Sequence, residues 1–318
     1  MSRYWIHRII EIIPLLIGIS LLSFTIFWLT PGDPVALVVD PTLLSASERA
    51  AVRDQLGLND SFPIRYAKMM RGLANGDLRS FKSKQPTYQV VREAFPTTFI
   101  ISVLGLGLAI LIALLLGVLA ARRPRGPVDR GLSLSLTTSL AVPSFVLALL
   151  LVRLFTEQWH LLPSTGIAPR GTSGFHPRAS LPYLVMPTIV VAAGAAPILA
   201  RYLRDALIGV LGEDYIRTAR AKGLAEPAVL ARHALRNSLI GVVSLLNTII
   251  PVTLGGSVIV ETIFGLPGLG KATTTAALSR DYPVVLTNVM FVAVLTVITN
   301  LIVDFVYGML DPRIRLQS

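Results

Sequence analysis

Residues 94–121 read AFPTTFIISVLGLGLAILIALLLGVLAA and hold no Asp, Glu, Lys or Arg. A helix needs about 20 mostly apolar residues to cross a bilayer core of about 30 Å, so this stretch is long enough to span a membrane. Five more charge-free windows of similar length follow or precede it. They are 12–32, 131–152, 179–200, 237–260 and 282–303. The sequence therefore predicts an all-α polytopic membrane protein with six transmembrane helices.

The composition agrees with a membrane protein and excludes several other classes. Of the 318 residues, 53% are hydrophobic and only 15% are charged, whereas an ordinary soluble domain is about 25% charged. There is no cysteine, which excludes disulfide frameworks, thiolate metal sites and Cys nucleophiles. The four histidines lie far apart along the chain. We therefore expect no metal site and no catalytic residue.

Lys and Arg in the loops predict the orientation. With the N-terminus inside, the short cytoplasmic pieces 1–11, 122–130, 201–236 and 311–318 hold 15 basic residues in 64 positions, against 5 in 47 for the two short outer loops. This is the asymmetry of the positive-inside rule. We expect both termini in the cytoplasm, and we attribute the net charge of +11 to membrane flanks rather than to nucleic-acid binding.

Four regions follow from this topology. The expected division is an N-terminal tail and first span at 1–32, an extracytoplasmic loop at 33–93, a five-helix core at 94–310 that includes the cytoplasmic loop 201–236, and a cytoplasmic tail at 311–318. In the outer loop, 47–56 is expected to be a Ser-capped helix that ends at Gly57, and Pro63 to Leu73 a second helix. Pro143 and Pro187 are expected to kink the third and fourth spans.

The cytoplasmic stretch Glu213-Asp214-Tyr215-Ile216-Arg217-Thr218-Ala219-Arg220-Ala221-Lys222-Gly223 is the most informative of the loops. Acids open it and basic residues close it, which is the charge order that a helix dipole favours. Gly223 is suited to the left-handed turn after a helix, and Pro227 to the start of the next one. We expect two short helices joined by a sharp turn. They form either a docking element for a cytoplasmic partner or an interfacial anchor.

This stretch resembles the coupling-loop motif of ABC importer permeases, in particular the variant found in the dipeptide/oligopeptide subfamily. The general pattern is Glu-Ala-Ala, three residues and Gly, and here Arg217-Thr218-Ala219 fills the triplet. The Glu and the first Ala are missing, Leu235-Arg236 replaces Leu-Pro, and Arg79 stands where the subfamily usually has Gly. Other matching motifs are 31–34, 76–78, 261–264, 267–270, 280–283 and 311–315. The resemblance covers essentially the whole chain.

The resemblance implies a bacterial inner-membrane permease subunit with the fold of type I ABC importer permeases. Its implied partners are a second homologous permease subunit, two ABC ATPase subunits that bind ATP and Mg²⁺, an extracytoplasmic solute-binding protein, membrane lipid and a peptide substrate. Related permeases carry nickel, glutathione or oligosaccharides. The residues implied in coupling to the ATPases are Glu213, Asp214, Tyr215, Arg217, Thr218, Ala219, Arg220 and Gly223.

One stretch imitates a nucleotide site. Residues 265–271 fit the phosphate-loop pattern Gly-x4-Gly-Lys, but Ala272 replaces the Ser or Thr that holds Mg²⁺, and a membrane helix rather than a strand is expected before it. We therefore expect no cofactor in this chain.

Polar residues inside the fifth expected span are candidates for a translocation pathway, because intramembrane polar groups usually face a cavity or another helix. The candidates are the polar residues Asn247, Thr248 and Thr253, together with Pro251. Either the helix breaks at Pro251 and exposes backbone carbonyls, or small residues pack closely there against a neighbouring helix.

Two other functions remain as alternatives. A stand-alone secondary carrier would need inverted repeats or embedded ionisable clusters, and an intramembrane enzyme would need paired catalytic groups at bilayer depth. The sequence offers evidence for neither.

Overall fold

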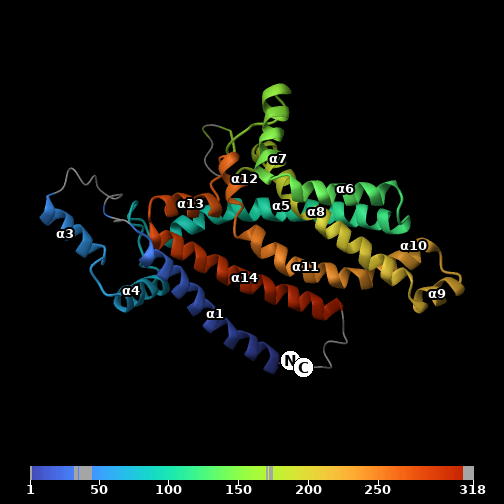
Figure 1. Ribbon diagram of the computed structural model, residues 1–318, viewed down its shortest axis with the longest axis horizontal. Coiled ribbons are helices and arrows are strands. Elements are labelled where there is room, and N and C mark those ends of the chain that lie inside the picture. Colours follow the sequence, from blue (N-terminus) through green and yellow to red (C-terminus); the bar gives the residue numbers. More distant parts are fainter. Residues whose placement is uncertain (1, 32–34, 36–44, 170, 172–174, 311–318) are drawn as a thin grey trace. The chain divides into compact units, whose positions relative to one another are not determined.

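The computed structural model describes residues 2–31, 35, 45–169, 171 and 175–310. The motif at 311–315, the tail 311–318 and most of the motif at 31–34 lie outside the described residues. Every regular element in the described part is a helix (Figure 1). The predicted all-α fold is confirmed.

The helices follow one another in this order. They are α1 (Ser2–Leu29), α3 (Ala46–Gln55), α4 (Phe62–Asn75), α5 (Thr87–Arg122), α6 (Pro127–Ala141), α7 (Ser144–Leu151), the π-helix η1 (Val152–Gln158), α8 (Pro177–Leu211), α9 (Asp214–Ala221), α10 (Glu226–Ala228), the π-helix η2 (Val229–Leu235), α11 (Arg236–Leu254), α12 (Val258–Ile263), α13 (Leu269–Leu278) and α14 (Tyr282–Leu310).

Five of the six expected spans are long apolar helices in the described part, and the remaining one, the third, is bent. The third expected span comprises α6 and α7–η1, which meet at an angle of 102°. Pro143 lies at this bend as the N-cap of α7, as expected of a residue that disfavours the helical conformation before it. Pro187, in contrast, lies inside α8, which continues on both sides of it.

Both helices predicted in the outer loop are present, with ends one or two residues from those predicted: α3 ends at Gln55 and α4 at Asn75, and each begins one residue earlier. The N-cap of α3 is Ser45 rather than Ser47, because Ser45 and Glu48 form a reciprocal capping box. The Ser45 hydroxyl and amide donate to the Glu48 carboxylate and hold the pKa of Glu48 below its usual range. Gly57 and Gly76 follow α3 and α4 with φ values of +64° and +75°.

The chain divides into two compact units. Unit 1 contains residues 1–98 and 267–297, and unit 2 contains residues 99–266 and 298–318. In unit 1, Phe24 of α1 packs on Phe62 and Tyr66 of α4, with ring centroids 5.1 and 5.4 Å apart. This aromatic cluster attaches the first span to the second outer helix. The boundaries of the two units differ from those of the four regions expected from the sequence, because residues 267–297 are in the same compact unit as residues 1–98.

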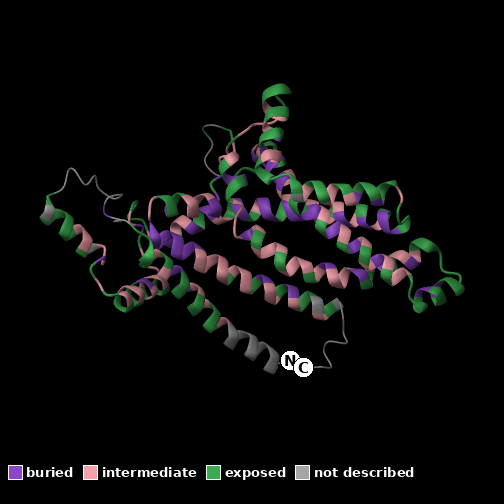
Figure 2. Cartoon of the chain, in the orientation of Figure 1, coloured by how far each residue is buried: buried purple, intermediate pink, exposed green. Residues whose placement is uncertain are grey.

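Unit 2 is built around α5, α8 and α11, whose small residues allow close packing. A Cβ on Gly117 of α5 would lie 2.9 Å from the carbonyl oxygen of Ala200 in α8. A Cβ on Gly241 of α11 would lie 2.6 Å from the ring of Tyr202. Figure 2 shows buried residues along both α5 and α8. Glycine therefore sets the distances between the helices.

Candidate functional site

The two short helices predicted in the loop 201–236 are present as α9 and α10, joined by a left-handed turn. The chain leaves α8 at Leu211, and Glu213 is the N-cap of α9. Asp214 lies in the first turn and Arg220 in the last, so the charges follow the helix dipole as expected. Pro227 lies in the first turn of α10. The two-helix prediction is confirmed.

The turn after α9 is a complete Schellman motif. The Gly223 amide donates to the carbonyl of Arg220 at 2.9 Å, and the Leu224 amide to that of Ala219 at 3.4 Å. Gly223 has a φ of +78°, which L-residues rarely adopt. This geometry turns the chain sharply between α9 and α10.

One side of α9 is anchored in unit 2. Ile216 is fully buried and Ala219 is 5% exposed. They belong to the same apolar cluster as Leu203 and Leu207 of α8 and Val229 of η2. The neighbouring Tyr215 is 42% exposed, and its hydroxyl accepts a hydrogen bond from Asn237 Nδ2 at 2.8 Å. The helix is thus fixed on a core that includes α5 and α11.

The opposite side of α9 is exposed and charged. The exposed residues of the predicted coupling set are Glu213, Asp214, Tyr215, Arg217, Thr218, Arg220 and Gly223. Arg217 reaches Asp214 at 3.1 Å, and Arg220 crosses the turn to Glu226 at 2.6 Å. Exposed pairs of this kind contribute about 0–1 kcal/mol each. Their side chains can therefore exchange partners when another protein binds.

Sequence reasoning missed two contacts of the element, those of Glu226 and Asn237. Each joins residues on opposite sides of the Gly223 turn, with separations of 6 and 22 positions. Only the folded turn brings them together. The opposite charges of Arg220 and Glu226 were the one available signal.

The candidate pathway residues lie on α11 and do not interrupt it. The α-helix continues past Pro251 to Leu254, and the break falls at Gly255–Ser257, where Gly256 has a φ of +94°. Of the two alternatives for this span, a break at Pro251 is therefore wrong. The Thr253 carbonyl accepts a hydrogen bond from Ser102 of α5 at 2.9 Å, which is a close helix contact. Thr248 is exposed, and Asn247 has a buried side-chain oxygen without a partner in the described residues.

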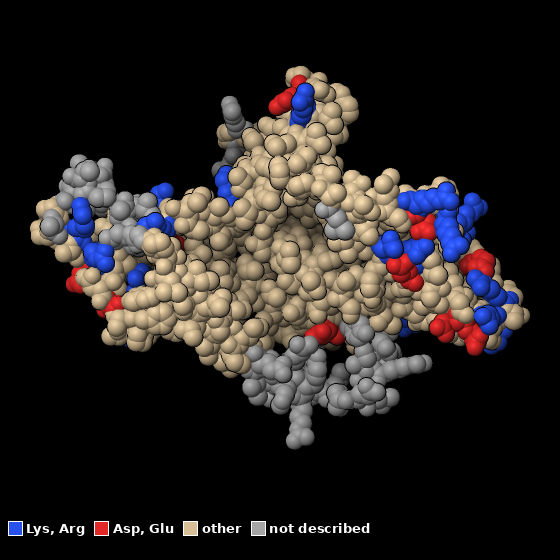
Figure 3. Space-filling view, viewed as in Figure 1, with Lys and Arg blue, Asp and Glu red and all other residues tan. Residues whose placement is uncertain are grey.

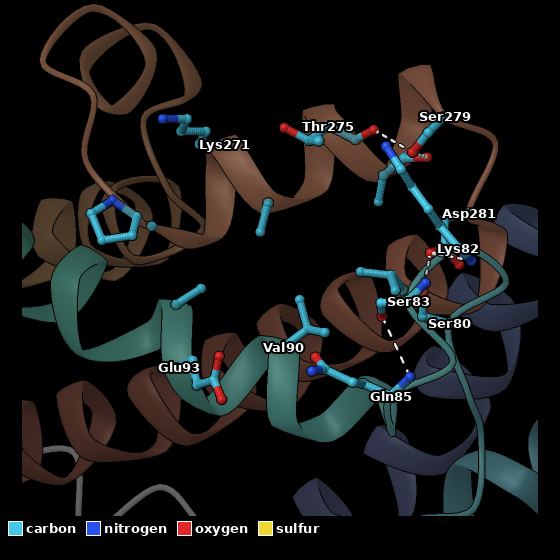
Figure 4. A pocket seen from close by; sticks show the side chains of 16 residues that line it. Ser80, Lys82, Ser83, Gln85, Val90, Glu93, Lys271, Thr275, Ser279 and Asp281 are labelled. Atoms are coloured by element: carbon cyan, nitrogen blue, oxygen red, sulfur yellow. Dashed lines mark hydrogen bonds between the residues drawn. The ribbon is translucent and has the colours of Figure 1, made fainter. Parts of the chain in front are cut away.

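The phosphate-loop imitation leads into α13 and follows α12, so a helix rather than a strand precedes it. Lys271 of α13 and Glu93 of α5 lie on opposite walls of a cleft in unit 1 with a volume of about 450 Å³ (Figure 4). At its other end the carboxylate of Asp281 accepts hydrogen bonds from the Ser80 hydroxyl and from the amides of Phe81, at 2.9 Å, and Lys82. Asp281 thereby fixes the loop that lines this end of the cleft.

Comparison with known proteins identifies the family. The model for binding-protein-dependent transport system inner membrane components matches residues 113–316, and the model for the N-terminal region of such components matches residues 1–102. The chain belongs to this family of ABC importer permeases. It is therefore a multi-pass inner-membrane component.

The relatives of this permease extend over its full length. It is 37% identical over 317 residues to the oligopeptide transport system permease protein AppB of Bacillus subtilis, with 99% of this chain and 100% of the relative covered. A putative peptide transport system permease of Brucella abortus is 36% identical with 99% of each covered. The glutathione transport system permease GsiC of Salmonella paratyphi A is 32% identical with 99% of each covered.

A solved structure supports the fold of the permease. A chain of the inward-facing MetNI methionine ABC transporter superposes with a TM-score of 0.57 at 16% identity, covering 71% of this permease and 99% of that chain. At this identity the likeness concerns the fold alone. The predicted type I importer permease fold is confirmed.

Proposed function

We propose that this permease forms half of the translocation pathway of an ATP-driven importer of di- or oligopeptides. A second homologous permease subunit supplies the other half. Two ATPase subunits bind ATP and Mg²⁺ and dock on α9, and an extracytoplasmic solute-binding protein delivers the peptide. The chain itself hydrolyses no ATP. The full-length similarity to permeases named for peptide transport supports the substrate class.

The construction of α9 is the observation that carries the coupling role. Its exposed side offers Asp214, Arg217 and Thr218 to a partner, while Ile216 and Ala219 are buried in a cluster that contains residues of α5, α8 and α11. Tightly packed cores transmit displacement rather than absorb it. A partner that moves α9 would therefore move the ends of three long helices.

Reconstitution tests this function. The permease, co-purified with the proteins that accompany it from its native membrane, is placed in proteoliposomes with external binding protein and labelled peptide. We expect uptake that requires ATP and peptide-stimulated ATP hydrolysis. Uptake by the permease alone without ATP would contradict the proposal and favour a secondary carrier.

Glutathione is the second candidate substrate, because GsiC is also a full-length relative. The same vesicles distinguish the two. Stimulation by glutathione but not by a series of di- to pentapeptides would assign the transporter to glutathione, and the reverse result would support oligopeptides.

A further inference from the structure

Unit 2 contains a cleft of its own, and none of the candidate coupling or pathway residues lines it. It lies among α5, α6, α7 and α8, has a volume of about 690 Å³ and is lined mainly by apolar and small side chains. Examples are Leu116 of α5, Leu134 and Thr138 of α6, and Gly194 and Pro197 of α8. Leu134 is 68% exposed, so the cleft is an open apolar groove on helices that the bilayer surrounds.

The groove has the length of one leaflet. Its lining residues on α8 extend from Val190 to Ala200, which at a rise of 1.5 Å per residue is about 15 Å. The hydrocarbon core of a bilayer is about 30 Å thick. One extended acyl chain of a phospholipid therefore matches the groove from end to end.

Arginines collect at one end of the groove. Gly131 and Ala200 line that end, and Arg130 and Arg201 are the adjacent residues on the same two helices. Figure 3 shows basic side chains gathered over the end of unit 2 where α6 begins and α8 ends. The apolar groove thus ends at a basic surface.

Most of this positive charge is not neutralised within the chain. The segments 122–130 and 201–205 hold six arginines and two aspartates. Arg204 pairs with both aspartates, Asp129 at 2.7 Å and Asp205. Arg201 reaches Asp205 at 3.3 Å and the Ser133 hydroxyl on α6 at 3.5 Å. In the part of the chain that the structure describes, Arg122, Arg123 and Arg130 are exposed and make no ion pair.

We propose that the groove binds an anionic phospholipid, with one acyl chain along α5, α6 and α8 and the phosphate on Arg130 and Arg201. An apolar channel of one-leaflet length that ends in surplus arginines is complementary to a molecule with an acyl tail and an anionic head. A helix of another subunit would fill the groove but would not by itself supply an anion to Arg130, which makes no ion pair in the part of the chain that the structure describes.

Native mass spectrometry of the purified transporter complex tests the proposal, with phosphatidylglycerol and phosphatidylethanolamine of identical chains added after delipidation. We expect phosphatidylglycerol to be retained preferentially. The double variant Arg130→Gln/Arg201→Gln should lower its affinity roughly tenfold or more and abolish the preference, because each arginine near the surface contributes a factor of about five. An unchanged preference would overturn the proposal.

A matched pair of glycine substitutions tests whether an acyl chain lies in the groove. Gly194 and Gly209 both lie exposed on α8 with open space where a Cβ would stand, but only Gly194 lines the groove. Gly194→Phe should lower the retention of both lipids, and Gly209→Phe should not. Gly194→Leu replaces the Phe variant if that does not accumulate. If Gly194→Phe instead releases a second permease subunit while lipid retention is unchanged, the groove is a subunit interface and the proposal is wrong.

Discussion

At Gly223 the backbone adopts a φ of +78°, and a Cβ there would meet no atom within 4 Å. The demand on this residue is therefore conformational rather than steric. The left-handed region is unfavourable by about 1–2 kcal/mol for L-residues, and more unfavourable for β-branched residues. The turn sets the angle between α9 and α10, so its loss should affect coupling before it affects the fold.

We expect Gly223→Val to lower ATP-driven uptake by roughly tenfold or more, which corresponds to the cost of the turn. Gly223→Asn should keep most of the uptake, because Asn tolerates the left-handed conformation. Uptake of labelled peptide in vesicles, normalised to the amount of inserted permease, measures both. Normal uptake in the Val variant would show that the turn is not needed.

Asp281 is a second residue with a defined task. Its carboxylate is buried and accepts hydrogen bonds from Ser80, Phe81 and Lys82. Asp281→Asn replaces half of the acceptor by a donor, so we expect the loop at 79–86 to become more sensitive to protease in the purified protein. Asp77→Asn, at an exposed carboxylate nearby, is the control. Equal cleavage of the two variants would show that the hydrogen bonds to Asp281 do not hold this loop in place.

At the level of the helices, close packing between α5 and α8 depends on glycine. Gly117 meets the Ala200 carbonyl and Leu203, whereas Gly107 on the same helix has open space. We expect Gly117→Ala to lower the thermal midpoint by the equivalent of about 1–3 kcal/mol of overpacking. Gly107→Ala should leave it unchanged or raise it, by up to about 1 kcal/mol of helix propensity. Shifts of the same sign in a thermal scan in detergent would refute this packing.

The start of α6 is attached to α8 by an ion pair. Arg204 Nη2 lies 2.7 Å from Asp129 Oδ2, and these side chains are 19% and 8% exposed. Removing one partner of a buried pair costs about 3 kcal/mol or more. We expect Asp129→Asn to destabilise the permease by about that amount.

Asp205→Asn is the matched control for this pair, because Asp205 also contacts Arg204 but is 51% exposed. It should have little effect on the thermal midpoint. Equal destabilisation by the two substitutions would show that the buried pair of Asp129 contributes no more to stability than the exposed pair of Asp205.

For the whole molecule, the sequence predicts the spans and the two-helix element well, because charge-free length and the order acid, base, glycine are local signals. Breaks inside helices are predicted less well. Pro251 is accommodated within α11, since membrane helices tolerate proline, and the break follows at Gly256. The Arg204–Asp129 contact joins residues 75 positions apart, a distance that no local pattern encodes.

The central claim is that the exposed side of α9 contacts an ATPase subunit. The chain has no cysteine, so single cysteines can be placed without removing others. Thr218→Cys puts one on the exposed side of α9, and Ala51→Cys puts one on the exposed surface of α3. A bifunctional maleimide is applied to opened native membranes, and the cross-linked products are identified by mass spectrometry. We predict that Thr218→Cys is linked to an ATPase subunit and that Ala51→Cys is not. Equal linkage from both positions, or no linkage from Thr218→Cys in an active transporter, would contradict the account.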